Sequence, residues 1–306
     1  MPFGALPPPR YYVYLDAVAK AGSIRKAAEN LHVASTALNR KINEIEDLIG
    51  TPLFERLPRG VRLTAAGEVL LATVRRSMSD LRSAVSQIEQ LRGQVRGTVQ
   101  LGCAESVATD LVPQCIAAYQ QTHPGVQFCL HTGVTTDLVG KLLADDVDLI
   151  LVHEPPQLDQ LKTIAAVRQP LCAMVPPGHP LAHHATLRLA DCQKYPVALG
   201  DSSFGSRKRI DAIVARTRMR LQVALESSTV GALKEYTRLT GAISFQYKTG
   251  IVRDVQRGEL VGIPLVDRSL AHTRLVLACR MGRALPVASV TFCQSLEQGL
   301  LLLGNA

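Results

Sequence analysis

SIRKAAENLHVASTALNRKINEI, residues 23–45, is the stretch that decides the fold. Its apolar residues recur at the i, i+3, i+4 and i+7 spacing of buried helix faces. The first face holds Ile24, Ala27, Ala28 and Leu31, and the second, after the polar His32, holds Val33, Ala37, Leu38, Ile42 and Ile45. Small alanines let two helices cross at close range, and Ser23 can cap the first helix. The stretch therefore predicts two short helices joined by a tight turn.

The exposed face of the second predicted helix carries Ser35, Thr36, Asn39, Arg40 and Lys41. Side chains of these types form hydrogen bonds in a DNA groove and neutralise phosphates. The stretch is thus typical of a helix-turn-helix with its recognition helix. The alternative is an ordinary antiparallel helix pair with a solvated polar face.

A short hairpin is predicted directly after these helices, in GTPLFERLPRGVRLTAAGEVLL, residues 50–71. Gly50 can end the second helix, and the β-prone pieces 53–54 and 61–63 flank a Pro-Arg-Gly turn. The hairpin presents Arg56, Arg59 and Arg62 together, and guanidinium groups suit phosphates and the minor groove. A wing after a helix-turn-helix is favoured over an arginine-rich surface loop.

A long helix is then expected from Ala65 to about Leu91, capped by Thr64. Its apolar positions alternate by three and four residues: Leu71, Val74, Met78, Leu81, Val85 and Ile88. This heptad seam predicts pairing with a partner helix, and hence a dimer with two recognition helices about one DNA turn, or a multiple of it, apart. The alternative is a helix packed on its own domain. Gly93 and Gly97 would form a hinge.

Composition describes an ordinary globular protein of about two domains: 306 residues, 47% hydrophobic and 20% charged, with a net charge of +8. The first 97 residues hold 14 Lys/Arg against 9 Asp/Glu, so the basic excess is concentrated there. Seven cysteines without a CxxC pair indicate buried thiols in a reducing compartment. MPFGALPPPR is unlike a secretory signal, and no apolar run reaches membrane-spanning length. We expect a cytoplasmic protein.

Strands and helices alternate from Thr98 onward, which predicts a parallel α/β sheet, or two α/β lobes with a cleft. Strands are expected near 98–103, 126–131, 147–153, 171–175, 197–199, 221–225, 242–245 and 274–279. Helices are expected near 107–121, 135–144, 206–215, 229–239 and 286–303. Ligands bind at the carboxyl ends of such strands, here Cys103–Val107, His131–Thr136, His153–Pro156 and Gly200–Gly205.

The chain resembles the LysR-type transcriptional regulators over nearly its whole length. Residues 22–68 carry the N-terminal signature, and GVTTDLVGKLLADDVDLILV, PPGHPLA and ELVGIPLVD match later segments. The resemblance implies an α/β chain with a winged helix-turn-helix at 1–64, a dimerisation helix at 65–93 and an effector-binding domain at 94–306 like the periplasmic binding proteins. Lobe I would comprise about 98–166 and 269–306, and lobe II about 167–268, with crossover strands near 166–169 and 266–268.

The resemblance also implies residue roles. DNA contacts are expected from Ser23, Arg25, Lys26, Ser35, Thr36, Asn39, Arg40, Lys41, Arg56, Arg59 and Arg62. Effector contacts are expected from Ala104, Ser106, Thr135, Thr136, His153, Ser202, Phe204 and Phe245. Hydroxyls at helix starts suit an anion, and the alternative is that Ser106 and Thr135 are only helix caps. The implied partners are promoter DNA, a small effector such as an organic acid, further copies in a dimer or tetramer, and RNA polymerase. No cofactor is expected.

Other functions have weaker support in the sequence. A two-lobed enzyme would need a nucleophile and a base paired in the cleft, and the sequence offers only isolated Ser106, Cys103 and His153. A redox-sensing regulator would use Cys103 and Cys192. No motif at metal-ligand spacing is present. The basic run Arg207–Arg220 is interpreted as a solvated helix face.

Overall fold

A computed structural model describes residues 9–304, and the chain divides into two compact units, Met1–Arg82 and Ser83–Ala306. These are called the first unit and the second unit below. The segment used above to argue against a secretory signal lies largely outside the described residues, as do residues 305 and 306. No helix among the described residues is long and apolar enough to cross a membrane.

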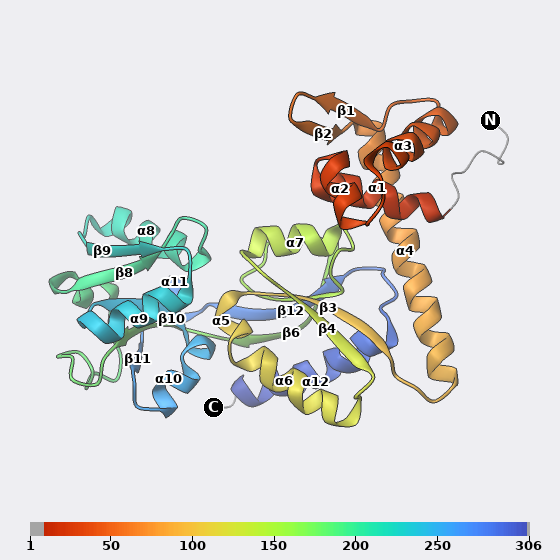
Figure 1. Ribbon diagram of the computed structural model, residues 1–306. Coiled ribbons are helices and arrows are strands. Elements are labelled where there is room, and N and C mark those ends of the chain that lie inside the picture. The colour runs from red at the N-terminus through yellow and green to blue at the C-terminus, as the bar shows by residue number, and fades with distance from the viewer. Residues whose placement is uncertain (1–8, 305–306) are drawn as a thin grey trace. The chain divides into compact units, whose positions relative to one another are not determined.

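Three helices form the body of the first unit: α1 (Arg10–Ala21), α2 (Ile24–Asn30) and α3 (Ser35–Ile49) (Figure 1). The predicted pair is confirmed as α2 and α3, with Ala27 and Ala28 buried between the helices. Ser23 caps α2 by accepting a hydrogen bond from the Lys26 N–H at 3.4 Å. Helix α1 was not predicted from the sequence, and its Tyr11, Leu15 and Val18 complete the core. Val33 differs from expectation, since it precedes α3 and is exposed.

The predicted hairpin is present as β1 (Phe54–Leu57) and β2 (Gly60–Leu63), with β1 extending beyond the first β-prone piece. Glu46 of α3 anchors it, because its carboxylate accepts hydrogen bonds from the N–H groups of Leu53 and Phe54 at 2.8 and 3.0 Å. Gly60 sits at φ 135°, and a side-chain carbon there would collide with the Gly22 carbonyl. The hairpin therefore packs closely on the α1–α2 turn only with glycine at this position.

Helix α4 spans Ala65–Leu91 as predicted, and Thr64 caps it through the Gly67 N–H at 3.0 Å. The expectation that the whole apolar seam faces a partner helix is wrong for its first half. Leu71 and Val74 are buried in the core of the first unit, where Met78 also packs. Leu81, Val85 and Ile88 are 59, 56 and 55% exposed. Only this second half of the seam is left to meet another molecule.

A serine face on the end of α4 packs within the second unit. The Ser83 hydroxyl donates to the Ala284 carbonyl at 2.6 Å, and the Ser86 hydroxyl accepts from the Val287 N–H at 3.0 Å. Ser86 thereby caps α12 (Val287–Gly304). The local sequence does not indicate this packing, because the partners of both serines lie 201 residues further along the chain.

Lobe I is built on a sheet of strand order β4-β3-β5-β12-β6. Its strands are β3 (Gly97–Cys103), β4 (Val126–Thr132), β5 (Leu149–His153), β6 (Leu161–Arg168) and β12 (Arg274–Arg280). Helix α7 (Thr135–Leu143) covers one face, and α6 (Leu111–Thr122) with α12 covers the other (Figure 1). Both faces of β5 are buried, as its unbroken apolar sequence indicated.

Lobe II has the order β11-β7-β10-β8-β9. Its strands are β7 (Leu171–Val175), β8 (Pro196–Gly200), β9 (Gln222–Ser227), β10 (Ile243–Tyr247) and β11 (Val261–Pro264). Helices α8 (Gly205–Thr217) and α9 (Val230–Thr240) are the longest of this lobe, beside α10 (Val252–Gln256) and α11 (Arg268–Ala271). Short 3-10 helices cover Leu189–Lys194 and Lys248–Gly250.

The prediction of a purely parallel sheet is wrong, because both sheets are mixed. In lobe I, β12 runs antiparallel to β5 and β6, and in lobe II, β7 runs antiparallel to β10 and β11. The expected crossover strand near 166–169 overlaps the end of β6, which begins earlier, at Leu161, whereas β11 ends at Pro264, before the second expected crossover at 266–268. The chain passes from lobe I to lobe II after β6 and returns to lobe I before β12. Strand β12 therefore completes a sheet whose other strands come much earlier in the sequence.

The parallel strands of the two lobes point their carboxyl ends toward each other. Strands β3, β4, β8 and β9 are followed by α5 (Glu105–Ala108), α7, α8 and α9, respectively. The predicted single helix at 107–121 is in fact α5 and α6, separated at Thr109–Asp110. Each of the four helices begins at the space between the lobes, which places its free N–H groups there.

Candidate functional site

The start of α3 presents exposed polar side chains on the helix pair of the first unit. Ser35, Thr36 and Arg40 are exposed, and Asn39 is half-buried beside them. Arg40 has only a loose ion pair, 3.8 Å from Glu44 at 73% exposure, so its guanidinium is available to a ligand. Four of the residues predicted to contact DNA thus share one face of α3.

Lys41 is held differently from its neighbours on α3. Its ammonium donates to the Glu44 carboxylate at 2.7 Å and to the Tyr11 hydroxyl at 3.0 Å. The hydrogen bond to Glu44 raises the pKa of Lys41, and the same bond lowers the pKa of Glu44. Because its charge is already compensated, Lys41 ties α3 to α1 and is a weaker partner for phosphate than Arg40.

The three arginines of the β1–β2 hairpin have distinct surroundings. Arg56 donates to the side-chain oxygens of Asn39 and Asn43 on α3, each at 2.9 Å. Arg62 pairs with Glu55 across the hairpin at 2.7 Å. Arg59 is exposed in the turn, and among the described residues no hydrogen bond or ion pair is found for its side chain. The tip of the hairpin therefore offers the Arg59 guanidinium to a ligand.

The first turn of α2 adds two further cations. Arg25 and Lys26 are both exposed, and Arg25 pairs with Glu29 one turn along the helix at 3.2 Å. Ser23 uses its hydroxyl as the helix cap, which leaves its remaining hydrogen-bonding capacity for a second partner.

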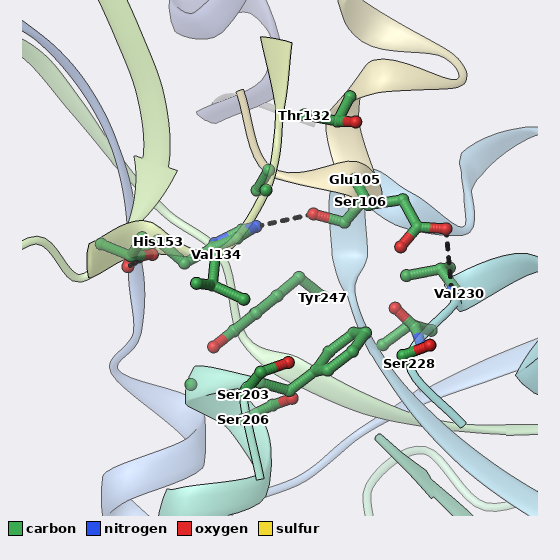
Figure 2. Close-up of a pocket in the computed structure, with 16 residues that line it drawn as sticks. Glu105, Ser106, Thr132, Val134, His153, Ser203, Ser206, Ser228, Val230 and Tyr247 are labelled. Carbon is green, nitrogen blue, oxygen red and sulfur yellow. Dashed lines mark hydrogen bonds between the residues drawn. The ribbon is translucent and has the colours of Figure 1, made fainter. Parts of the chain in front are cut away.

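A cavity of about 280 Å³ lies between the two lobes of the second unit. Lobe I lines it with Ala104, Glu105, Ser106, Thr132, Gly133, Val134, Thr135 and His153, and lobe II with Ser203, Phe204, Gly205, Ser206, Ser228, Val230, Gln246 and Tyr247. Figure 2 shows many of these side chains converging on one space. The volume is at the lower end of the range for small-molecule sites.

Five of the effector residues expected from the sequence line this cavity: Ala104, Ser106, Thr135, His153 and Phe204. Thr136, Ser202 and Phe245 are not among the lining residues, and Phe245 is buried in the core of lobe II. Gln246 and Tyr247, at the carboxyl end of β10, line the cavity, whereas Phe245 lies further back in the strand. Glu105 and Tyr247 were missed, although Glu105 lies within the strand-end segment Cys103–Val107.

Ser106 and His153 are not isolated from each other, contrary to the sequence analysis. The Ser106 hydroxyl lies 3.0 Å from His153 Nε2, and the His153 ring stacks on Tyr247 with centroids 3.6 Å apart. Burial lowers the pKa of His153 to about 3, so it is neutral at pH 7 and a weak base. No partner is found for its Nδ1 within the described residues. A hydrolytic dyad needs a stronger base held by a third group, so this pair is poorly suited to catalysis.

Three polar contacts connect the lobes around the cavity. The Glu105 carboxylate accepts a hydrogen bond from the Val230 N–H at 2.9 Å and so occupies the N-terminus of α9. The guanidinium of Arg253 pairs with Asp110 at 2.5 Å. Arg209 pairs with Glu154 at 3.0 Å, so part of the basic run 207–220 serves lobe contact instead of forming only a solvated face.

The cysteines do not form a redox pair. Cys103 is in β3 of lobe I and Cys192 is in lobe II, and burial raises the pKa of each thiol to about 12. Thiolates, which are the reactive form, are therefore disfavoured at both positions. The alternative of a redox-sensing regulator that uses Cys103 and Cys192 is therefore not supported by the surroundings of these thiols.

Comparison with known proteins matches both units to one family. Residues 9–68 match the bacterial regulatory helix-turn-helix protein, lysR family, and residues 92–300 match the LysR substrate binding domain. The RuBisCO operon transcriptional regulator of Allochromatium vinosum is 30% identical over 277 residues, which cover 90% of this chain and 91% of that protein.

Solved structures share the fold at lower identity. A full-length OxyR variant from Pseudomonas aeruginosa has a TM-score of 0.71 at 20% identity and covers 95% of each chain. The CcmR regulatory domain of Synechocystis PCC6803, in complex with 2-PG, has a TM-score of 0.59 at 21% identity, covering 67% of this chain and 98% of that one.

Proposed function

Since the chain belongs to the LysR family of transcriptional regulators, we propose that α3 and the hairpin of its first unit contact operator DNA and that the cavity of its second unit binds the effector. At the level of the family, it is a DNA-binding transcriptional regulator with an effector-binding domain. The family is one of regulators and not of enzymes. The roles of individual residues, the self-association of the chain and its control by an effector are part of this proposal.

Ser35, Thr36 and Asn39 read base edges in this proposal, while Arg40 and Arg59 meet phosphates or the minor groove. The observation that carries it is the exposure of Arg40 and Arg59 without tight intramolecular partners in the described chain, beside the polar start of α3. Ser23, Arg25 and Lys26 are placed to contact the backbone. Arg56 acts by holding Asn39 and Asn43 in position, because its guanidinium is already occupied.

Self-association is proposed through the exposed half of the α4 seam. Leu81, Val85 and Ile88 form an apolar stripe that water would otherwise cover. A second α4 could bury this stripe at the heptad spacing of a coiled coil. Two copies present two recognition helices, which bind two half-sites together far more tightly than one.

Control by the effector follows from its position between lobes. A ligand that contacts both lobes stabilises the lobe arrangement that binds it better, and this arrangement can differ in its affinity for DNA. RNA polymerase is proposed as the partner that responds to this change in DNA binding. The protein is proposed to act in the cytoplasm.

The test is binding of duplexes from the gene neighbourhood of this chain, measured by gel retardation and by fluorescence anisotropy at roughly 50–200 mM salt. We expect specific binding that weakens steeply with salt and that Arg40→Ala weakens further. Absence of binding at low salt would refute the proposal. An assay with ester and amide substrates, matched by Ser106→Ala, tests the hydrolase alternative, for which we expect no turnover.

A further inference from the structure

The cavity between the lobes lacks a side-chain cation. Among its lining residues, Glu105 is the single formally charged side chain, and no lysine or arginine is present. His153 adds no charge, since burial lowers its pKa to about 3. Arg209 lies near Tyr247, outside the lining. Its guanidinium is already paired with Glu154 at 3.0 Å and with the Ser269 carbonyl at 3.1 Å. The lining therefore offers a phosphate group no cationic side chain.

One end of the cavity nevertheless favours a carboxylate. The N-termini of α7 and α8 both open there, at Val134–Thr135 and Phe204–Gly205, and neither has a side-chain cap. Free N–H groups and helix dipoles attract an anion at such positions. His153, which lines the same cavity, is only 7% exposed, and its buried Nδ1 is without a partner in the described chain, so the lining contains an unsatisfied polar atom.

The acidic group lies at the other end. In Figure 2, Glu105 lies to the right of Tyr247 with Ser228 and Val230, while Val134 lies to its left and Ser203 and Ser206 lie below it. One oxygen of Glu105 accepts the Val230 N–H at 2.9 Å, which closes the N-terminus of α9 to an external anion. The second oxygen keeps its lone pairs available and can accept a donor from a ligand.

This inference rests on the proposed effector function. We propose that the cavity binds an amino acid: a small zwitterion whose carboxylate lies at the starts of α7 and α8 and whose ammonium lies at Glu105. A carboxylate without an amine would leave the second oxygen of Glu105 without a donor from the ligand. A phosphate ester such as 2-PG, which the CcmR regulatory domain binds, would bring more negative charge to a lining with no cation. A zwitterion satisfies both ends.

The experiment measures the melting temperature of the full chain with four sets of probes. They are the common L-amino acids with the straight-chain ω-amino acids, the corresponding acids without the amine, the corresponding amines without the carboxylate, and 2-phosphoglycolate with succinate. Titration calorimetry then gives the affinity of each compound that raises the melting temperature. The ω series also reports the separation of the two charges.

We expect at least one amino acid to bind, with affinity at least about tenfold higher than that of its deaminated acid or its amine. Glu105→Gln keeps an oxygen for the Val230 N–H but removes the charge. The Glu105→Gln change should lower the affinity for the amino acid at least about tenfold and should change the affinity for the deaminated acid by less than about threefold. The matched control is Glu226→Gln, which removes an exposed carboxylate that pairs with Arg207 outside the cavity and should leave both affinities unchanged.

Several results would overturn this assignment. If 2-phosphoglycolate or succinate binds and no amino acid does, the ligand class is wrong while the effector function stands. If the amino acid binds but is unaffected by Glu105→Gln, Glu105 does not recognise the ammonium. If no probe binds at all, the amino-acid class is refuted, and the DNA-binding experiment above decides the regulator function separately.

Discussion

The two units of this chain recognise charge in opposite ways. The first unit presents cations on exposed elements, where Arg40 and Arg59 have little or no compensation from the described residues. The second unit encloses its site and lines it with helix N-termini and one carboxylate, with no side-chain cation among the lining residues. A long polyanion such as DNA offers many phosphates to mobile surface charges, so exposure is sufficient. A small ligand must replace its whole hydration shell, so each charge needs a fixed partner.

The sharpest way to break this comparison is to test whether the units are independent bodies. Arg283 is fully buried in lobe I, where it donates to Asp148 at 2.6 Å and to the Val147 carbonyl at 2.9 Å. Arg283→Met leaves the Asp148 charge buried without this partner, which should destabilise the second unit by about 3–5 kcal/mol. We expect calorimetry to show one transition lowered and the transition of the first unit unchanged.

Arg257→Met is the control for this change, since Arg257 is 67% exposed and pairs loosely with Glu259 at 3.9 Å. It should alter stability by less than about 0.5 kcal/mol. A parallel fall of both transitions in Arg283→Met would mean that the first unit depends on the second for its stability, and the comparison of two separate recognition bodies would be lost.

The second prediction concerns the exposed seam of α4. The double change Leu81→Asp and Val85→Asp places charges in the proposed helix–helix contact, so the chain should become monomeric. Affinity for a duplex with two half-sites should fall roughly 100-fold, about 2.7 kcal/mol, because the second head no longer binds intramolecularly. Sedimentation and anisotropy measure the two effects. Val69→Asp, at an exposed position of α4 outside the seam, should change neither. A dimer that survives the double change would place the contact elsewhere.

The success of the sequence-based predictions also differs between the two units. The helix pair, the hairpin and the cap of α4 by Thr64 were predictable, because each depends on residues close in the chain. The cavity is assembled from several segments between Ala104 and Tyr247, so only five of its lining residues near strand ends were anticipated: Ala104, Ser106, Thr135, His153 and Phe204. Nothing near Glu105 in sequence indicates that it caps a helix beginning at Val230, 125 residues away. Strands β7 and β12 were predicted, but their antiparallel direction was missed for the same reason.

The third prediction uses the buried His153 to separate the units by pH. Its pKa is about 3 in the folded protein, against about 6.5 when unfolded, so the unfolded state binds the extra proton between these values. Stability of the second unit should therefore rise with pH across this window, by roughly 1.4 kcal/mol per pH unit for this group. His153→Phe keeps a ring on Tyr247 and should flatten that slope in calorimetry between about pH 6.5 and pH 5.

His183→Gln serves as the control for the pH experiment, because His183 is exposed and should keep the wild-type slope. An unchanged slope in His153→Phe would mean that His153 is protonated in the folded protein. A charged imidazolium would then face the cavity, and the argument that its lining lacks a cation would fail along with the amino-acid assignment.

The smallest effect compares two arginines of one hairpin. Arg59→Ala should weaken DNA binding by roughly tenfold, about 1.4 kcal/mol, and lower the slope of log K against log salt by about 0.9, as expected for one lost phosphate contact. Arg62→Ala should weaken binding less than about threefold, since Glu55 already compensates much of the Arg62 charge at 2.7 Å. Anisotropy over the same salt range measures both variants on the same duplex.

Both side chains are exposed and lie close together in the chain, and each variant removes one positive charge. A difference in affinity between the two variants therefore reports the pairing of Arg62 with Glu55. Equal losses and equal slopes would show that intramolecular pairing does not decide which cations meet DNA, and the contrast between free charges in the first unit and fixed ones in the second would lose its basis.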